Sequence, residues 1–519
     1  MPILAAVGRR AVLRQAGLAA LAALVRPPGG PAAAPAVVRR RRPGAPLGVQ
    51  AGEVGPGGAV VWSAADRPAR LEVEYATTER FADRRRIIGS TARPETGLTA
   101  RAVLADLPPG QQILYRARFV DPKDPRTASE PVEGRFRTPP RTAEDVSFVW
   151  SADTAGQGWG INLDWDGMRL YAVMAGVEPD FFVHCGDLVY ADDPLVAEVP
   201  LPGGGVWRNV VTEAKAKVAE TLEEFRGNHR YNLLDRHVRA LNARVPLYVQ
   251  WDDHDVRDNW YPGRVLTDDP RYRERRVDVL AARARRAIAE FTPLGGGPRY
   301  RVVHRGPLLD VFLLDLRSHR GPNGDNRAPA LTRAARILGA AQLAWLEQAL
   351  RRSRATWKVV VAGQPIGLVV WDDFRRRRGI DGIAQGDGPP LGRELEIARL
   401  LATIRRGAIR NVVWITADVH YCATHEYHPE RARFTDFEPF HEFVSGPIHA
   451  GSFGPNALDD TFGPRVVFAR PATRPNAPPS EGQLYFGHVR IDGRTGVLAV
   501  THRDVTGAAL HVTELAPAR

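Results

Sequence analysis

Cysteine is nearly absent from this 519-residue chain, which has only Cys185 and Cys422. Two thiols cannot build a disulfide framework, and they are too few for an iron–sulfur cluster held by four cysteines. We interpret both cysteines, and His184 beside the first, as core residues. The composition, 44% hydrophobic and 25% charged, is that of an ordinary globular protein with room for two or three domains. A large hydrophobic core must therefore hold the fold.

Acidic residues are missing from the first 42 positions, which contain eight arginines. These arginines supply eight of the twelve excess positive charges of the chain. The basic balance is therefore largely a property of this leader, and nucleic-acid binding is not predicted. Residues 8–14 (GRRAVLR) precede a short apolar run at 18–25 and a Pro/Ala-rich segment, an order that resembles a twin-arginine export signal.

A long apolar run is also missing from this leader. The stretch at 18–25 is shorter than the ~20 residues that a membrane-spanning helix needs, so no stable membrane insertion is predicted. We therefore predict that residues 1–42 are a twin-arginine signal peptide and linker, and that the protein is periplasmic or extracellular. A disordered tail rich in Arg, Ala and Pro is the alternative.

Short alternating stretches broken by turns fill residues 43–138. Such stretches at 58–62, 69–75, 102–104 and 113–119, with Pro-Gly turns between them, predict a small β-sandwich. The turn Leu107-Pro108-Pro109-Gly110 before a Tyr-bearing strand resembles a fibronectin III or immunoglobulin-like (Ig-like) module. Residues 139–142 are predicted to be a linker.

Apolar runs alternate with helix-length amphipathic segments in residues 143–515, which predicts an α/β domain. The predicted strands are 146–150, 181–184, 247–250, 309–314, 358–361 and 412–415. The predicted helices are 213–225, 231–241, 277–291 and 342–350, and a closing hairpin is expected at 484–491 and 497–502.

Polar residues follow nearly every one of these strands. They are Asp153, Gly186 to Tyr190, Asp252 to Asp255, Asp315 with Arg317, Gly363-Gln364, and Asp418 to His420. Ligands bind beyond the carboxyl ends of strands in open α/β sheets, so we expect these side chains to form one site at one sheet edge. Clustered carboxylates would repel one another unless a cation neutralised them. Oxygen and imidazole ligands indicate a site for Mn, Fe, Zn or Ca, and two ions about 4 Å apart would suit phosphoryl transfer.

Four ordered blocks resemble the calcineurin-like metallophosphoesterase superfamily: Asp153, Gly186-Asp187-Leu188-Val189-Tyr190, Asp253-His254-Asp255 and Asp418-Val419-His420. More narrowly, residues 181–187, 251–260, 314–318, 345–346 and 357–359 resemble the alkaline phosphatase D (PhoD) family. The resemblance implies a four-layer α/β/β/α sandwich after a small all-β domain. It also implies an exported phosphatase that hydrolyses phosphomonoesters or phosphodiesters by attack of a metal-activated hydroxide.

The resemblance also implies roles for individual residues. Asp187 would bridge two metal ions, with Asp153, Tyr190 and His420 at the first ion and Asp253 and Asp418 at the second. A tyrosinate ligand favours Fe(III) at the first position. His254 would protonate the leaving group, and Arg317 and Asn259 would bind the substrate. Arg317 could instead form a structural ion pair with Asp315.

The chain departs from the family pattern at three places. Asp153, in Ser151-Ala152-Asp153-Thr154, stands where a cysteine ligand is usual. Gly363-Gln364-Pro365 replaces a His-containing block, and Asp418 replaces a histidine. The second metal site is therefore richer in oxygen, which favours Ca, Mn or Mg over Zn.

Alternative functions remain open from the sequence. One is a phospholipase D-like phosphodiesterase that acts on lipid or cell-wall phosphates, and another is a non-catalytic surface binding protein. The histidines at 425, 428, 441 and 449 are too irregularly spaced to indicate a metal site, so at most one is expected near the pocket. The run of arginines at 375–378 is interpreted as a solvated loop that could attract a phosphate-rich substrate. Oligomeric state is not indicated.

Overall fold

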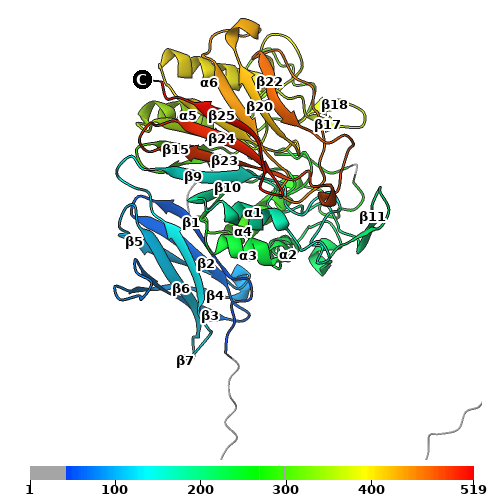
Figure 1. Ribbon diagram of the computed structural model, residues 1–519. Coiled ribbons are helices and arrows are strands. Elements are labelled where there is room, and N and C mark those ends of the chain that lie inside the picture. The colour runs from blue at the N-terminus through cyan, green and yellow to red at the C-terminus, as the bar shows by residue number, and fades with distance from the viewer. Residues whose placement is uncertain (1–41, 268, 296–299, 519) are drawn as a thin grey trace, which may run out of the picture. The chain divides into compact units, whose positions relative to one another are not determined.

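Two large β-sheets contain the predicted α/β strands (Figure 1). The computed structural model describes residues 42–267, 269–295 and 300–518, so the predicted signal segment lies, apart from Arg42, outside the described residues. The strand order of the first sheet is β25-β24-β23-β9-β10-β13-β1-β2-β5, and that of the second is β14-β15-β16-β19-β21-β20-β22. The expectation of one sheet edge is therefore wrong, because the six predicted strands divide equally between the two sheets.

The first sheet has a parallel centre. Its strands β9 (Val146–Ser151), β10 (Phe181–His184) and β13 (Leu247–Val249) are parallel and almost wholly buried, as the apolar runs predict. The meander β23 (Tyr485–Ile491), β24 (Leu498–Asp504) and β25 (Ala509–Leu515) adds to one side, so the closing hairpin is confirmed and continues by one strand.

The second sheet repeats this plan. Four parallel strands form its centre: β15 (Leu309–Leu313), β16 (Trp357–Val361), β19 (Val412–Thr416) and β21 (Phe440–Val444). The antiparallel strands β14 (Arg301–His304), β20 (Cys422–Tyr427) and β22 (Pro464–Arg470) complete it. The parallel strands of both sheets end in the loops that carry the predicted polar residues.

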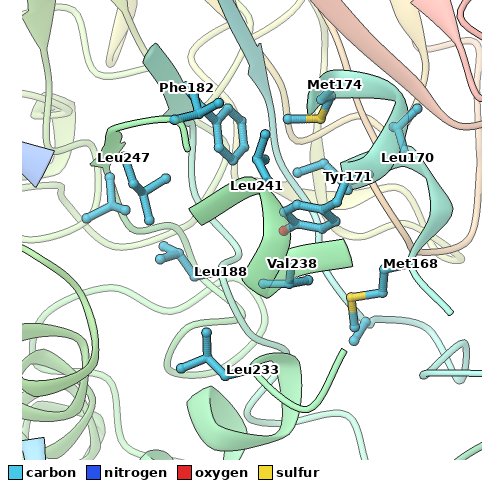
Figure 2. Packing of buried hydrophobic residues seen from close by; sticks show 14 of the residues in the cluster. Met168, Leu170, Tyr171, Met174, Phe182, Leu188, Leu233, Val238, Leu241 and Leu247 are labelled. Atoms are coloured by element: carbon cyan, nitrogen blue, oxygen red, sulfur yellow. The ribbon is translucent and has the colours of Figure 1, made fainter. Parts of the chain in front are cut away.

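Apolar side chains from the two sheets pack against each other. Phe148 of the first sheet stacks on Phe181 at 4.7 Å between ring centroids, and both belong to a buried cluster with Val359 and Ile415 of the second sheet. Helices cover the outer faces. Figure 2 shows residues of α1 (Arg169–Gly176) and α3 (Arg236–Asn242) packed with Phe182 and Leu247 of the first sheet. Helices α5 (Ala340–Arg352) and α6 (Glu394–Arg406) pack on the second.

The helix predictions are correct in part. The segments 277–291 and 342–350 correspond to α4 (Val277–Phe291) and α5. The predicted helix 213–225 is wrong, because a 3-10 turn, Glu213–Lys215, is followed by a break and then by α2 (Leu222–Asn232). Thr221 and Glu224 form a capping box that starts α2, and the predicted helix 231–241 spans the end of α2 and most of α3.

The N-terminal strands form two sheets. One holds β3 (Ala69–Ala76), β4 (Arg85–Ala92), β6 (Gln112–Asp121), β7 (Asp124–Ala128) and β8 (Val132–Arg137). The strands β1 (Val49–Gly55), β2 (Gly58–Ala64) and β5 (Thr99–Ala105) instead join the first large sheet, where β1 pairs with β13 through Gly52 and Leu247. The boundaries at 138 and 143 stay predictions. Among the described residues, every helix is too short or too polar to cross a bilayer.

Gln250 ties the two sheets together beside the polar loops. Its Nε2 donates to the carbonyl oxygens of Leu314 at 2.7 Å and Val361 at 2.9 Å. We predict that Gln250→Leu lowers the free energy of unfolding by about 1–3 kcal/mol, because the buried Leu314 carbonyl loses this donor. A urea titration of the metal-loaded protein measures the change. An unchanged midpoint would contradict the importance of this tie.

Candidate metal centre

Three side chains from three strand ends meet in a first group. Tyr190, after β10, places its hydroxyl 3.0 Å from Nε2 of His420, after β19, and 3.4 Å from Oδ1 of Asp153, after β9. His420 Nε2 is 3.5 Å from the same Asp153 oxygen. All three side chains are buried. The structure therefore brings together the residues predicted for the first ion.

A second group of acidic residues adjoins the first. Ligand atoms of Asp187, Asp253 and His254 lie within 4.8 Å of one another, and so do those of Asp252, Asp253 and Asp418. The ring of Tyr190 stacks on that of His254 at 4.2 Å, which connects the two groups. All six predicted metal ligands thus belong to one cluster. Asp252, the third carboxylate of the second group, was not assigned a role from the sequence.

The backbone at this cluster is unusual. Asp153, Asp187, Asp418 and His420 have φ values of 67°, 50°, 73° and 60°, in the left-handed region that side chains rarely adopt. Such residues each cost on the order of 1–3 kcal/mol, and they concentrate at functional sites. The surrounding structure therefore holds these four residues in conformations that local preference opposes.

Buried carboxylate oxygens test whether cations fit here. Asp153 Oδ2 is buried and has no hydrogen-bond donor among the described residues, whereas Asp253 Oδ1, also buried, forms no hydrogen bond but has the guanidinium of Arg317 3.2 Å away. Space at the first is kept by Gly446, where an added Cβ would lie 2.6 Å from Asp153 Oδ2. A buried carboxylate oxygen without a partner is costly, and a bound cation would satisfy it. Carboxylate, phenol and imidazole donors accordingly fit hard or borderline metal ions.

The pKa values of the acidic side chains also show the cost of burying so many carboxylates together. Burial, followed by neighbouring carboxylates, raises the pKa values of Asp153, Asp187 and Asp418 well above 3.8. Burial also raises the pKa of Asp252 to about 6, against the opposing effect of Arg317. Without cations, the folded protein would therefore hold protons on carboxyls that the unfolded chain has already released.

This difference predicts how the metal-free protein responds to pH. Between the ordinary carboxyl pKa of 3.8 and the raised values, the folded state binds more protons than the unfolded state, so stability falls as pH rises. Each pKa unit corresponds to about 1.4 kcal/mol. We expect the melting temperature of chelator-treated protein to fall relative to that of metal-loaded protein between about pH 4 and pH 8, because the other titrating groups, among them buried histidines whose pKa values are lowered, affect both forms alike. A difference between the two forms that stays constant or narrows as pH rises would contradict the prediction.

His254 is held by an acidic partner that the sequence analysis missed. Its Nδ1 lies 2.9 Å from Oδ1 of Asp192, and its main-chain N–H donates to Asp187. Burial lowers the pKa of His254, but Asp192, Asp253 and Asp187 outweigh it and keep the pKa well above 6.5. Asp192 thus orients the imidazole, and the surrounding carboxylates favour its protonated form. The only available signal was the Asp192-Asp193 pair directly after Tyr190-Ala191.

His420 is oriented in a similar way by the backbone. Its Nδ1 lies 2.5 Å from the carbonyl oxygen of Gly451, and burial lowers its pKa to about 4. A ring that donates from Nδ1 keeps a lone pair on Nε2, the atom beside Tyr190 and Asp153. The geometry therefore presents a neutral imidazole nitrogen to the cluster.

Arg317 has different partners from those considered in the sequence. Its fully buried guanidinium pairs with Asp252 and with Asp381 at 2.9 Å, and Nη2 lies 3.2 Å from Asp253. Only its main-chain N–H donates to Asp315, at 3.1 Å. The positive charge of the guanidinium thus neutralises part of the negative charge of the acidic cluster. The predicted contact with substrate phosphate stays a prediction.

Asn259 is bonded on both sides. Its main-chain N–H donates to Asp253 Oδ2 at 2.6 Å, and its side-chain Nδ2 donates to the carbonyl of Asp372 at 3.0 Å. Substrate contact by this residue also stays a prediction. Asn259 thus links the acidic cluster to Asp372, which lies in the short β-hairpin at residues 371–380.

The residues interpreted as core are buried. Cys185 and Cys422 are free thiols at 1% and 0% exposure, and His184 is also buried. Of the four irregularly spaced histidines, His449 is next to the cluster, where its main-chain N–H donates to the carbonyl of Asp153 at 3.0 Å.

Solved structures share this fold. A structure of PhoD aligns over 90% of this chain and 88% of its own, with a TM-score of 0.67 and 20% identity. A purple acid phosphatase from yellow lupin (Lupinus luteus) seeds aligns over 90% and 74%, with a TM-score of 0.57 and 12% identity. The fold and the acidic cluster define a metallophosphoesterase-like protein with a mixed α/β architecture.

The chain belongs to the PhoD-like phosphatase family. Residues 148–502 match that family, and residues 31–140 match the PhoD-like phosphatase N-terminal domain. Alkaline phosphatase D of Bacillus subtilis (strain 168) is 29% identical over 314 residues, which are 56% of this chain. The match spans half the length of that relative. The resemblance inferred from the sequence is confirmed.

Proposed function

We propose that the protein is a metal-dependent phosphatase that hydrolyses phosphomonoesters, phosphodiesters or both. The observation that carries this proposal is the cluster of Asp153, Asp187, Asp253 and His420, in which the buried Asp153 Oδ2 has no hydrogen-bond donor among the described residues. Family membership supports the same activity. We further propose a four-layer α/β/β/α sandwich, an Ig- or fibronectin III-like N-terminal domain at 43–138, and export by the twin-arginine route.

Each residue has a proposed part in the reaction. Asp153, Tyr190 and His420 would hold one ion, Asp253 and Asp418 a second, and Asp187 both. When bound, the ions would supply charge neutralisation and an activated water for attack on phosphorus. His254, held by Asp192, would give its Nε2 proton to the leaving oxygen, and Arg317 would limit repulsion among the carboxylates. Arg317 and Asn259 are also proposed to help position the substrate.

The donor set supports a proposal for the ions. A phenolate ligand favours Fe(III) beside Tyr190, and the oxygen ligands Asp187, Asp253 and Asp418 proposed for the second ion favour Ca, Mn or Mg. Elemental analysis of protein produced through its own export route tests this assignment. Two or more ions per chain are expected, and protein without bound metal and without turnover would support the non-catalytic alternative.

Substrate preference requires a parallel assay. A nitrophenyl phosphomonoester, a bis-nitrophenyl phosphodiester and a phospholipid are compared with the same metal-loaded preparation. Turnover of at least one class is expected, and turnover confined to the phospholipid would favour the phospholipase D-like alternative. Absence of turnover from all three by protein with full metal content would contradict the proposed function.

A further inference from the structure

A hairpin beside the metal cluster has a basic and aromatic tip. Its strands are β17 (Trp371–Asp373) and β18 (Arg378–Ile380). Phe374, which follows β17, is 64% exposed, and the four arginines at 375–378, the last of them in β18, are all exposed. Arg376 pairs with Asp373 at 2.9 Å, so one of the four charges is balanced locally. The tip therefore combines an exposed aromatic ring with an excess of positive charge.

Hydrogen bonds fix this hairpin to the cluster. Asn259 bonds the proposed ligand Asp253 through its main chain and Asp372 of β17 through its side chain, at 2.6 and 3.0 Å. Asn323 Nδ2 donates to Asp372 Oδ1 at 2.9 Å. Asn259 thus links the base of the hairpin directly to Asp253, a proposed ligand of the second ion. These part-buried hydrogen bonds fix the base of the hairpin beside the cluster.

We propose that the tip of this hairpin, residues 374–378, is a docking surface for an anionic phospholipid bilayer. Charge complementarity supplies the first argument, because exposed arginines attract anionic head groups. The second argument is the exposed ring of Phe374, which would gain from contact with the lipid interface. A soluble anionic polymer would use the arginines alone. Combined with the proposed function, on which this step rests, the surface would bring a phosphate carried on a lipid to the metal cluster.

Vesicle binding without turnover tests the docking surface. Full-length mature protein is sedimented with vesicles of phosphatidylglycerol and phosphatidylcholine in equal parts, and with phosphatidylcholine vesicles alone. Each basic side chain near an anionic surface strengthens binding about fivefold. We expect preference for the anionic vesicles and a loss of about 30-fold in Arg375→Gln/Arg378→Gln. Phe374→Ser is expected to weaken binding about tenfold.

The β4 strand offers matched controls. Arg84 and Arg85 are exposed like the two hairpin arginines, and Ile88 is 61% exposed, close to the value for Phe374. Arg84→Gln/Arg85→Gln and Ile88→Ser should retain vesicle binding if the surface is assigned correctly. Equal losses in hairpin and control variants would overturn the assignment, and so would binding to soluble polyphosphate without binding to vesicles. Because binding is read without hydrolysis, failure of the proposed phosphatase function leaves this result interpretable.

Discussion

Asp187→Asn is expected to abolish measurable phosphatase turnover and to reduce the number of metal ions bound per chain. Asp187 lies shortly after β10, and its Oδ1 accepts a hydrogen bond from the main-chain N–H of His254. Asparagine would keep an oxygen for this hydrogen bond but would lose the negative charge that binds the two ions. Changes in residues that merely orient ligands cost about 10–100-fold in metal affinity or activity. Loss of a bridging carboxylate should exceed the upper end of that range. Initial rates and elemental analysis of the same preparation measure both effects.

The stability of the same variant distinguishes a metal role from a structural one. Burial raises the pKa of Asp187 well above 3.8, so its charge opposes folding when no ion is bound. The metal-free variant should therefore melt at the same or a higher temperature than metal-free wild type at neutral pH. Asp310→Asn, at a buried aspartate that bonds His304 and Ser353, serves as a control that keeps its metal. A variant with full metal content and normal turnover would contradict the assignment.

His254→Gln is expected to slow hydrolysis in proportion to how poor the leaving group is. General acid catalysis contributes typically 10²–10⁴-fold, and it matters most when the departing oxygen is strongly basic. We expect a loss in this range for an alkyl phosphate and a much smaller loss for a nitrophenyl phosphate. The measurement is the dependence of rate on the leaving-group pKa, which should steepen in the variant.

Asp192→Asn tests how the imidazole is positioned. The variant keeps the shape of the residue but removes the carboxylate that lies 2.9 Å from Nδ1 of His254, so the pKa of His254 should fall. Its rate loss should follow the same leaving-group pattern with smaller size, and its activity profile should shift to lower pH. His304→Gln is the control, because His304 on β14 also pairs with an aspartate, Asp310 on β15, at 2.7 Å. Equal losses for all leaving groups would indicate a purely structural role.

The strands of the α/β part could be predicted because each is a short apolar run. Phe181–His184 and Trp357–Val361, for example, are buried on both faces and contain few polar residues. The prediction of one helix over 213–225 was wrong because it overlooked Thr221 and Glu224, whose capping box is the sequence signal for the break before α2. The division of strands between two sheets was not, because an apolar run does not specify its neighbours.

The candidate site was likewise predictable from the sequence only in part. Positions such as Asp187 and His420 follow from their place directly after a strand. Partner choice does not: Arg317 pairs with Asp252 and Asp381, which are distant in sequence, and Asp192 reaches His254 across two loops. Left-handed backbone at Asp153 and Asp418 was also hidden, since aspartate only weakly favours that conformation.

The pairing of β1 with β13 has a consequence for how the protein can be divided. β13 leads directly to Asp252 and Asp253, and β1 covers its outer side through Gly52 and Leu247. A fragment that begins after residue 138 would leave β13 as a bare edge, with unpaired backbone groups available to other chains. Self-association would then begin next to the loop that carries Asp252 and Asp253. The N-terminal strands β1, β2 and β5 are therefore an integral part of the first large sheet and cannot be removed as a separate domain.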